Sequence, residues 1–183
     1  MIQIFDSLKG ETYQKFIQLL LEQSDSFIFN VPNMGKTLVN ERNAEFMPEH
    51  KLGYTEEFEQ DLHYEYIKKI EPYIDFIKDD TISVCTDTGY LDQVSNLEIQ
   101  VYHMSISEKS KDFFAKTNNF EKWLYPEFPE DPCFLKNKKC VFQCISHEEL
   151  FFLYSANRKI RSFLKDNNIK YKRMFVWKIP RFK

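Results

Sequence analysis

The spacing of apolar residues changes several times along this chain of 183 residues. In residues 9–23 and 55–77 they recur every three or four positions, as on one face of an amphipathic helix. In residues 26–31 and 97–104 they alternate with polar residues, which is typical of a strand with one buried face. Because the two periods are interleaved, the sequence predicts an α+β fold in which helices flank a mixed or antiparallel sheet.

The second half of the chain continues this mixture. Ser107 is a suitable N-cap residue for a helix over 108–117 because its hydroxyl can accept hydrogen bonds from the free amides of the first turn. Residues 133–135 and 140–145 lie on either side of a polar turn. This arrangement predicts a β-hairpin.

Single residues decide two further predictions. We expect one long helix over 55–77 that is adjusted at Pro72, because this residue lies within the pattern and removes a backbone donor. Two helices that meet there are the alternative. Ser146 and Glu149 have the spacing of a capping box. We therefore expect a helix to begin at Leu150.

The end of the chain differs from the rest in charge. Residues 156–183 contain ten lysines and arginines and one acid, a net charge of +9, whereas residues 1–155 carry −12. We expect a basic helix at 157–167 and a strand at 169–179 with one buried face. The basic segment can pack on the acidic body and neutralise it, which we favour, or it can face a separate charged partner. We find no internal repeat or linker, so residues 1–183 are expected to form one compact domain.

Several classes of protein are excluded by the sequence. The longest apolar runs, such as residues 150–154, are too short to span a membrane. The first residues lack the basic region and apolar core of a signal peptide. We therefore expect a cytoplasmic protein whose cysteines are reduced: Cys85, Cys133, Cys140 and Cys144.

Two incomplete motifs suggest ligands but do not have the required spacing. Residues 33–37 resemble the end of a phosphate-binding P-loop, but Asn30 stands where its first glycine is required. Zinc could be held by three cysteines and an imidazole, but no Cys-x-x-Cys turn is present among Cys133, Cys140, Cys144 and His147. We therefore expect an ordinary loop at residues 33–37 and a hairpin lined by buried thiols at the cysteines. No metal and no cofactor are expected.

One stretch carries a family resemblance. Residues 123–134 read Trp-Leu-Tyr-Pro-Glu-Phe-Pro-Glu-Asp-Pro-Cys-Phe, and a charged turn and a His-Glu pair at 147–148 follow. This pattern resembles a group of small Bacillus-type proteins that are often labelled "stage III sporulation protein AH", over about residues 95–155. The resemblance implies a recurrent structural unit and no known catalytic residue, and nothing in the sequence could serve as the membrane anchor of the authentic ring component. The residues of that unit are Trp123, Pro129, Glu130, Asp131, Phe134, His147 and Glu148.

Our leading hypothesis is a non-enzymatic protein that binds a macromolecule, because no complete catalytic motif is present. The charge of −12 over residues 1–155 favours a basic protein partner, in an immunity or antitoxin-like role. The oligomeric state is open. The acids predicted to contact the partner lie at the start of the helix expected over 55–77: Glu56, Glu57, Glu59 and Asp61.

Nucleic acid is the alternative partner. The C-terminal segment combines aromatic and basic residues, which can stack on bases and neutralise phosphates. Phe175 and Trp177 fall on the expected buried face of the strand over 169–179, which favours a structural role for both. The basic residues predicted to contact nucleic acid are Arg158, Arg161, Lys170, Lys172 and Arg173.

An enzyme is the third hypothesis. His147 would act as a general acid or base together with Glu130 or Asp131, or would activate Cys144 as a nucleophile. An imidazole in the first turn of a helix is more often a surface residue. These four residues are therefore candidates whose roles depend on whether the fold brings them together.

Overall fold

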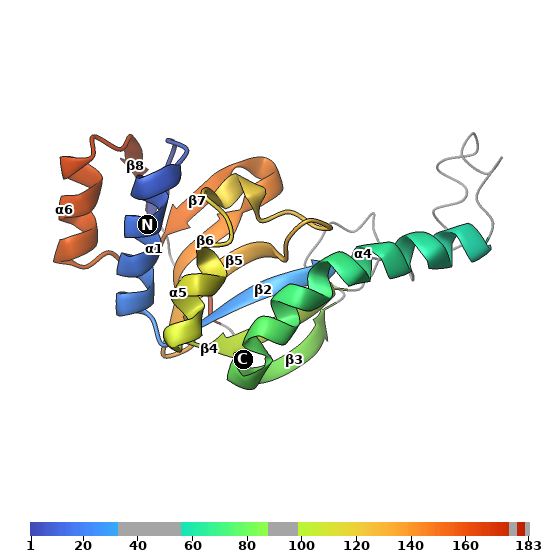
Figure 1. Ribbon diagram of the computed structural model, residues 1–183. Coiled ribbons are helices and arrows are strands. Elements are labelled where there is room, and N and C mark those ends of the chain that lie inside the picture. Colours follow the sequence, from blue (N-terminus) through green and yellow to red (C-terminus); the bar gives the residue numbers. More distant parts are fainter. Residues whose placement is uncertain (33–55, 88–98, 176–178, 182–183) are drawn as a thin grey trace.

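A computed structural model describes residues 1–32, 56–87, 99–175 and 179–181, and at positions 56–64, 66 and 87 only the backbone (Figure 1). The strands in this part of the chain form one sheet in the order β3-β4-β2-β5-β6-β7-β1-β8, in which all neighbours are antiparallel. The predicted α+β class is confirmed, with the antiparallel alternative for the sheet. The strands are β1 (Ile2–Ile4), β2 (Ser26–Pro32), β3 (Thr81–Asp87), β4 (Ile99–Ser105), β5 (Glu130–Lys136), β6 (Lys139–Ile145), β7 (Leu150–Leu153) and β8 (Tyr171–Arg173).

Helices cover one face of this sheet (Figure 1). They are α1 (Gly10–Gln23), α4 (Glu56–Ile77), α5 (Glu108–Phe114) and α6 (Arg158–Asp166), with short 3-10 turns η2 (Lys78–Asp80), η3 (Phe120–Lys122) and η4 (Ser146–Glu148). Ser107 caps α5 as predicted, because its hydroxyl accepts a hydrogen bond from the Lys109 amide at 3.1 Å. None of the helices in the described part of the chain is long and apolar enough to cross a membrane.

Aromatic side chains fill the core between the helices and the sheet. Phe16 of α1 packs edge-on against Phe142 of β6, with ring centroids 5.4 Å apart. Phe120 of η3 lies 4.8 Å from the same Phe142 ring. Both faces of β2 are buried, since a second apolar cluster containing Ile28 lies on the side of the sheet away from the helices. The central position of β2 explains why its apolar run is continuous.

Helix α4 continues through Pro72 without a break. Pro72 is on an exposed side of the helix, whereas Ile70 and Ile77 are buried in the core. The single-helix prediction is therefore confirmed, and the alternative of two helices is wrong. The first turns of α4 extend past the sheet, away from the end that carries α6 (Figure 1).

The helix expected from Leu150 is wrong, because this segment is strand β7. Ser146 begins the short 3-10 turn η4, and Glu149 ends it in the left-handed conformation, with φ of 54°. Strand β7 then pairs with β6 on one side and with β1 on the other. As a strand, this segment forms hydrogen bonds with two neighbouring strands and buries the alternating residues Phe151 and Leu153. A helix at this position would form neither set of strand hydrogen bonds.

The long strand expected over 169–179 is also wrong. Among the described residues of this range only 171–173, which form β8, pair with β1, and Tyr171 is 40% exposed. Phe175 is 82% exposed, so the predicted buried face ends before it, and Trp177 lies outside the described residues. The three-residue strand β1 is the only described neighbour of β8, which limits the length over which the pair can be formed.

Candidate functional site

The basic helix α6 and strand β8 lie at the same end of the sheet (Figure 1). The Asn157 side chain caps α6 by accepting a hydrogen bond from the Ile160 amide at 2.9 Å. Ile160 and Leu164 are buried in the core, so the basic side of α6 faces outward. Asn168 adopts a left-handed conformation, with φ of 53°, and turns the chain from α6 toward β8.

The five bases predicted to contact nucleic acid are all exposed and come from α6, from β8 and from the residue that precedes β8. We call this surface the basic edge, and it consists of Arg158, Arg161, Lys170, Lys172 and Arg173. Lys170 is also fixed through its backbone, because its amide donates to the Asp6 carboxylate at 2.5 Å. The fold therefore brings the two segments that carry these bases to the same end of the sheet.

The C-terminal segment packs on the body as expected, and among the described residues few ion pairs accompany this packing. Among the described residues, Lys159 and Glu22 form the one ion pair that joins the segment to the body, at 2.8 Å. The segment is held instead by apolar burial on α6, by β pairing and by a hydrogen bond from the Cys140 amide to the Pro180 carbonyl at 3.0 Å. Within the described ranges, neutralisation of the segment by an ion pair is thus seen at Lys159 alone, and the expected neutralisation of the other bases stays a prediction.

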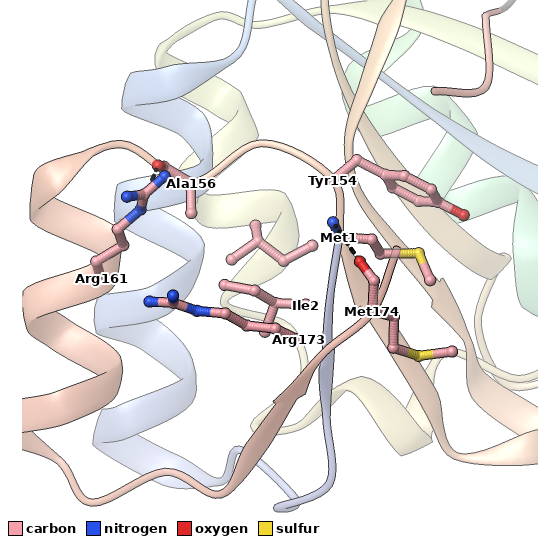
Figure 2. Close-up of a pocket in the computed structure, with 8 residues that line it drawn as sticks. Met1, Ile2, Tyr154, Ala156, Arg161, Arg173 and Met174 are labelled. Carbon is pink, nitrogen blue, oxygen red and sulfur yellow. Dashed lines mark hydrogen bonds between the residues drawn. The ribbon is translucent and has the colours of Figure 1, made fainter. Parts of the chain in front are cut away.

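A pocket of about 270 Å³ lies between α6 and β8 (Figure 2). Arg161 reaches it from α6 and Arg173 from β8, and the figure shows both guanidinium groups on the same side. The Nε of Arg161 donates to the Ala156 carbonyl at 3.0 Å, which holds its side chain at the pocket. Apolar side chains, including those of Ile2 and Leu153, supply much of the remaining lining. Sequence reasoning did not find this pocket.

The fold also brings together the four candidates for catalysis. The Asp131 carboxylate accepts a hydrogen bond from the Ser146 amide at 2.7 Å, and the Ser146 hydroxyl lies 3.0 Å from the Cys144 thiol. Burial raises the pKa of Glu130 to about 6, an effect that the nearby charge of His147 opposes. Burial also raises the pKa of Asp131 above its ordinary value.

We call Glu130, Asp131, Cys144 and His147 the acid cluster, and its geometry favours a structural role. Cys144 is completely buried, and burial raises the pKa of its thiol well above the ordinary value, so it is a poor nucleophile. His147 is exposed and lies 3.8 Å from Glu148 rather than within hydrogen-bond distance of Cys144. The Asp131 carboxylate is occupied in holding the turn η4. The residues converge, but they do not form an accessible nucleophile and base.

The zinc-binding arrangement considered for the cysteines is not formed. Cys133 and Cys140 lie 3.4 Å apart in the apolar cluster behind the sheet, whereas Cys144 belongs to the core under the helices. The predicted hairpin of β5 and β6, lined by buried thiols, is confirmed. Within the described ranges, no group of three or more metal-ligating side chains is placed to hold an ion.

Replacing Glu130 with glutamine is expected to stabilise the protein at pH 7 by about 1–2 kcal/mol. The folded pKa of about 6 lies above the ordinary value of 4.5, so folding disfavours the ionised carboxylate. The wild type should therefore gain stability as the pH falls from above 6 to below 4.5, and Glu130→Gln should lack this part of the gain. Urea unfolding of both proteins across this pH range measures the difference. If the free energy of unfolding changed with pH by the same amount in both proteins, the prediction would be contradicted.

The remaining sequence candidates are only partly described. Glu56, Glu57, Glu59 and Asp61 lie in the first turns of α4, but their side chains are outside the described residues. The P-loop-like residues 33–37 also lie outside them. The missed strand β1 had a weak signal, the alternation of Ile2 and Ile4, in a segment too short to be assigned from its pattern.

No family model, no curated protein and no solved structure matches this chain. The resemblance to sporulation-type proteins therefore stays a prediction. The function has to be inferred from the residues of the chain and their arrangement.

Proposed function

We propose that the protein binds nucleic acid through the basic edge. The observation that carries this proposal is the gathering of five exposed bases on α6 and around β8, none of which forms an ion pair with a described carboxylate. A cationic surface that is not neutralised by the protein's own acids attracts polyanions. The α4 helix, with its acidic first turns, lies toward the opposite end of the sheet (Figure 1).

Exposed rings accompany these charges. Tyr171 of β8 is 40% exposed and Phe175, shortly after the strand, is 82% exposed. An aromatic ring beside basic side chains allows a base to stack while the phosphates are neutralised, without a requirement for one sequence. The combination favours single-stranded nucleic acid, because its bases are free to stack.

Binding of a single-stranded oligonucleotide should weaken about 20- to 100-fold between about 50 and 200 mM salt, if three to five bases each neutralise one phosphate. The reason is the release of condensed counterions, which contributes less as the salt concentration rises. Fluorescence anisotropy with labelled DNA and RNA measures this dependence. The absence of binding to any strand at about 50 mM salt would contradict the proposed function.

A protein partner is the second candidate, and the extension of the first turns of α4 past the sheet favours it (Figure 1). Reversing the charge of Glu56, Glu57, Glu59 and Asp61 should abolish recovery of a basic partner from native lysate. A control variant should retain the partner; it reverses four exposed acids elsewhere, namely Glu71, Glu108, Asp112 and Asp166. Equal recovery with both variants would contradict this candidate.

A further inference from the structure

We propose that the pocket between α6 and β8 binds a phosphomonoester, either the terminal phosphate of a nucleic-acid strand or that of a free nucleotide. The proposal deepens the proposed function, because Arg161 and Arg173 belong to the basic edge. Binding of the terminal phosphate of a strand rests on the proposed function, whereas binding of a free nucleotide does not. It adds a distinction that the basic edge does not make, between the end of a strand and its interior.

The two arginines are well placed to hold one anion. Arg161 belongs to a helix that is capped by Asn157 and buried through Ile160, and its Nε donates to Ala156 at 3.0 Å. Arg173 belongs to a strand whose register is fixed by pairing with Ile2. Both guanidinium groups reach the same pocket (Figure 2). The planar guanidinium group of each arginine presents paired N–H donors, which match the oxygens of a phosphate.

The charge of the pocket fits a monoester better than the interior of a strand. A phosphomonoester carries about −1.5 to −2 at pH 7, whereas each phosphodiester in a strand carries −1. Neither Arg161 nor Arg173 forms an ion pair within the described residues, so both charges remain for a ligand. Two cations that face one small pocket therefore favour the terminal, more highly charged phosphate.

The size and the remaining lining of the pocket point in the same direction. Its volume of about 270 Å³ lies just below the usual range of ligand pockets, so it accommodates a small group and not a duplex. Ile2 and Ala156 are half-buried and line the same pocket, where they provide apolar contact for a sugar or a base beside the phosphate. These features are those of a pocket for a chain end or a single nucleotide.

The test compares one oligonucleotide with a terminal phosphate at the 5′ end, at the 3′ end, or with hydroxyl groups at both ends. Binding to the wild type should be about tenfold tighter for a phosphorylated form, because charged hydrogen bonds to arginine are gained. Arg173→Ala should remove this preference, and Arg173→Lys, which keeps the charge but loses the paired donors, should reduce it. Circular dichroism confirms that each variant is folded.

Lys172→Ala is the matched control, since Lys172 precedes Arg173 on β8 and successive side chains point to opposite faces of a sheet. It should weaken binding of all three oligonucleotides by a similar factor and leave the preference for the phosphate unchanged. Equal affinities of the wild type for the three forms would overturn the phosphate pocket, while salt-dependent binding would still support the basic edge.

Adenosine monophosphate and adenosine form the second arm of the test. If no oligonucleotide binds, the proposed function is wrong, but binding of the monophosphate that Arg173→Ala abolishes would support the pocket as a site for a free nucleotide. If neither the monophosphate nor any phosphorylated strand binds to the wild type in calorimetry, the pocket proposal is overturned as well.

Discussion

Replacing Trp123 with alanine is expected to lower the free energy of unfolding by about 3–5 kcal/mol. Trp123 is completely buried, and its ring centroid lies 5.2 Å from those of both Phe113 and Phe114. Its indole Nε1 also donates to the Tyr13 hydroxyl at 2.9 Å. Alanine would therefore leave a large cavity between α1 and α5 and remove one partner of a buried hydroxyl.

Urea unfolding monitored by far-ultraviolet circular dichroism measures this loss, because the signal does not depend on tryptophan. The matched control is Trp123→Phe, which fills most of the volume but cannot donate to Tyr13. It should cost less than alanine, since the Tyr13 hydroxyl still accepts from Thr117 at 2.9 Å and donates to the Phe114 carbonyl at 3.2 Å. A loss below about 1 kcal/mol for the alanine variant would contradict the tight packing described for this site.

Replacing Asp131 with alanine is expected to cost about 2–4 kcal/mol. Asp131 is 5% exposed, and its carboxylate accepts from the Ser146 amide at 2.7 Å, so alanine would leave a buried donor without a partner. Its backbone is also left-handed, with φ of 52°, a conformation that aspartate and asparagine adopt more easily than alanine. The first effect acts on the turn η4, which precedes strand β7, and the second acts at the start of strand β5, to which Asp131 belongs.

Asp131→Asn separates the structural role of this residue from a catalytic one. Asparagine keeps a carbonyl acceptor for Ser146 and tolerates the left-handed backbone, and it removes a carboxylate whose ionised form is disfavoured by burial. Its stability at pH 7 should therefore be close to that of the wild type in urea unfolding. An asparagine variant as unstable as the alanine variant would show that the negative charge itself holds the turn.

The acid cluster and the basic edge differ in what a solvent-borne ligand can reach. In the cluster, Asp131 and Cys144 are buried and already engaged with Ser146. At the basic edge, the guanidinium groups of Arg161 and Arg173 are exposed at a pocket. This contrast is the reason for preferring binding of an anion at the edge over catalysis in the cluster.

Elements with strong local signals could be predicted from the sequence. The apolar period of α1, the Ser107 cap and the charges of the basic edge depend on residues close together in the chain. Such signals report backbone preference and amphipathic character, which are properties of a short segment. These local signals predicted the fold class and the single helix through Pro72. They also predicted the residues of the basic edge.

Other features depend on contacts between distant segments. Leu150 begins a strand and not a helix because β7 lies between β1 and β6, although Ser146 and Glu149 have the spacing of a capping box. The same long-range pairing places β8 beside β1 and so brings Arg173 to Arg161. Local patterns fix which side chains a segment presents, whereas the free energy of burial and strand pairing across the sheet fixes which segments meet.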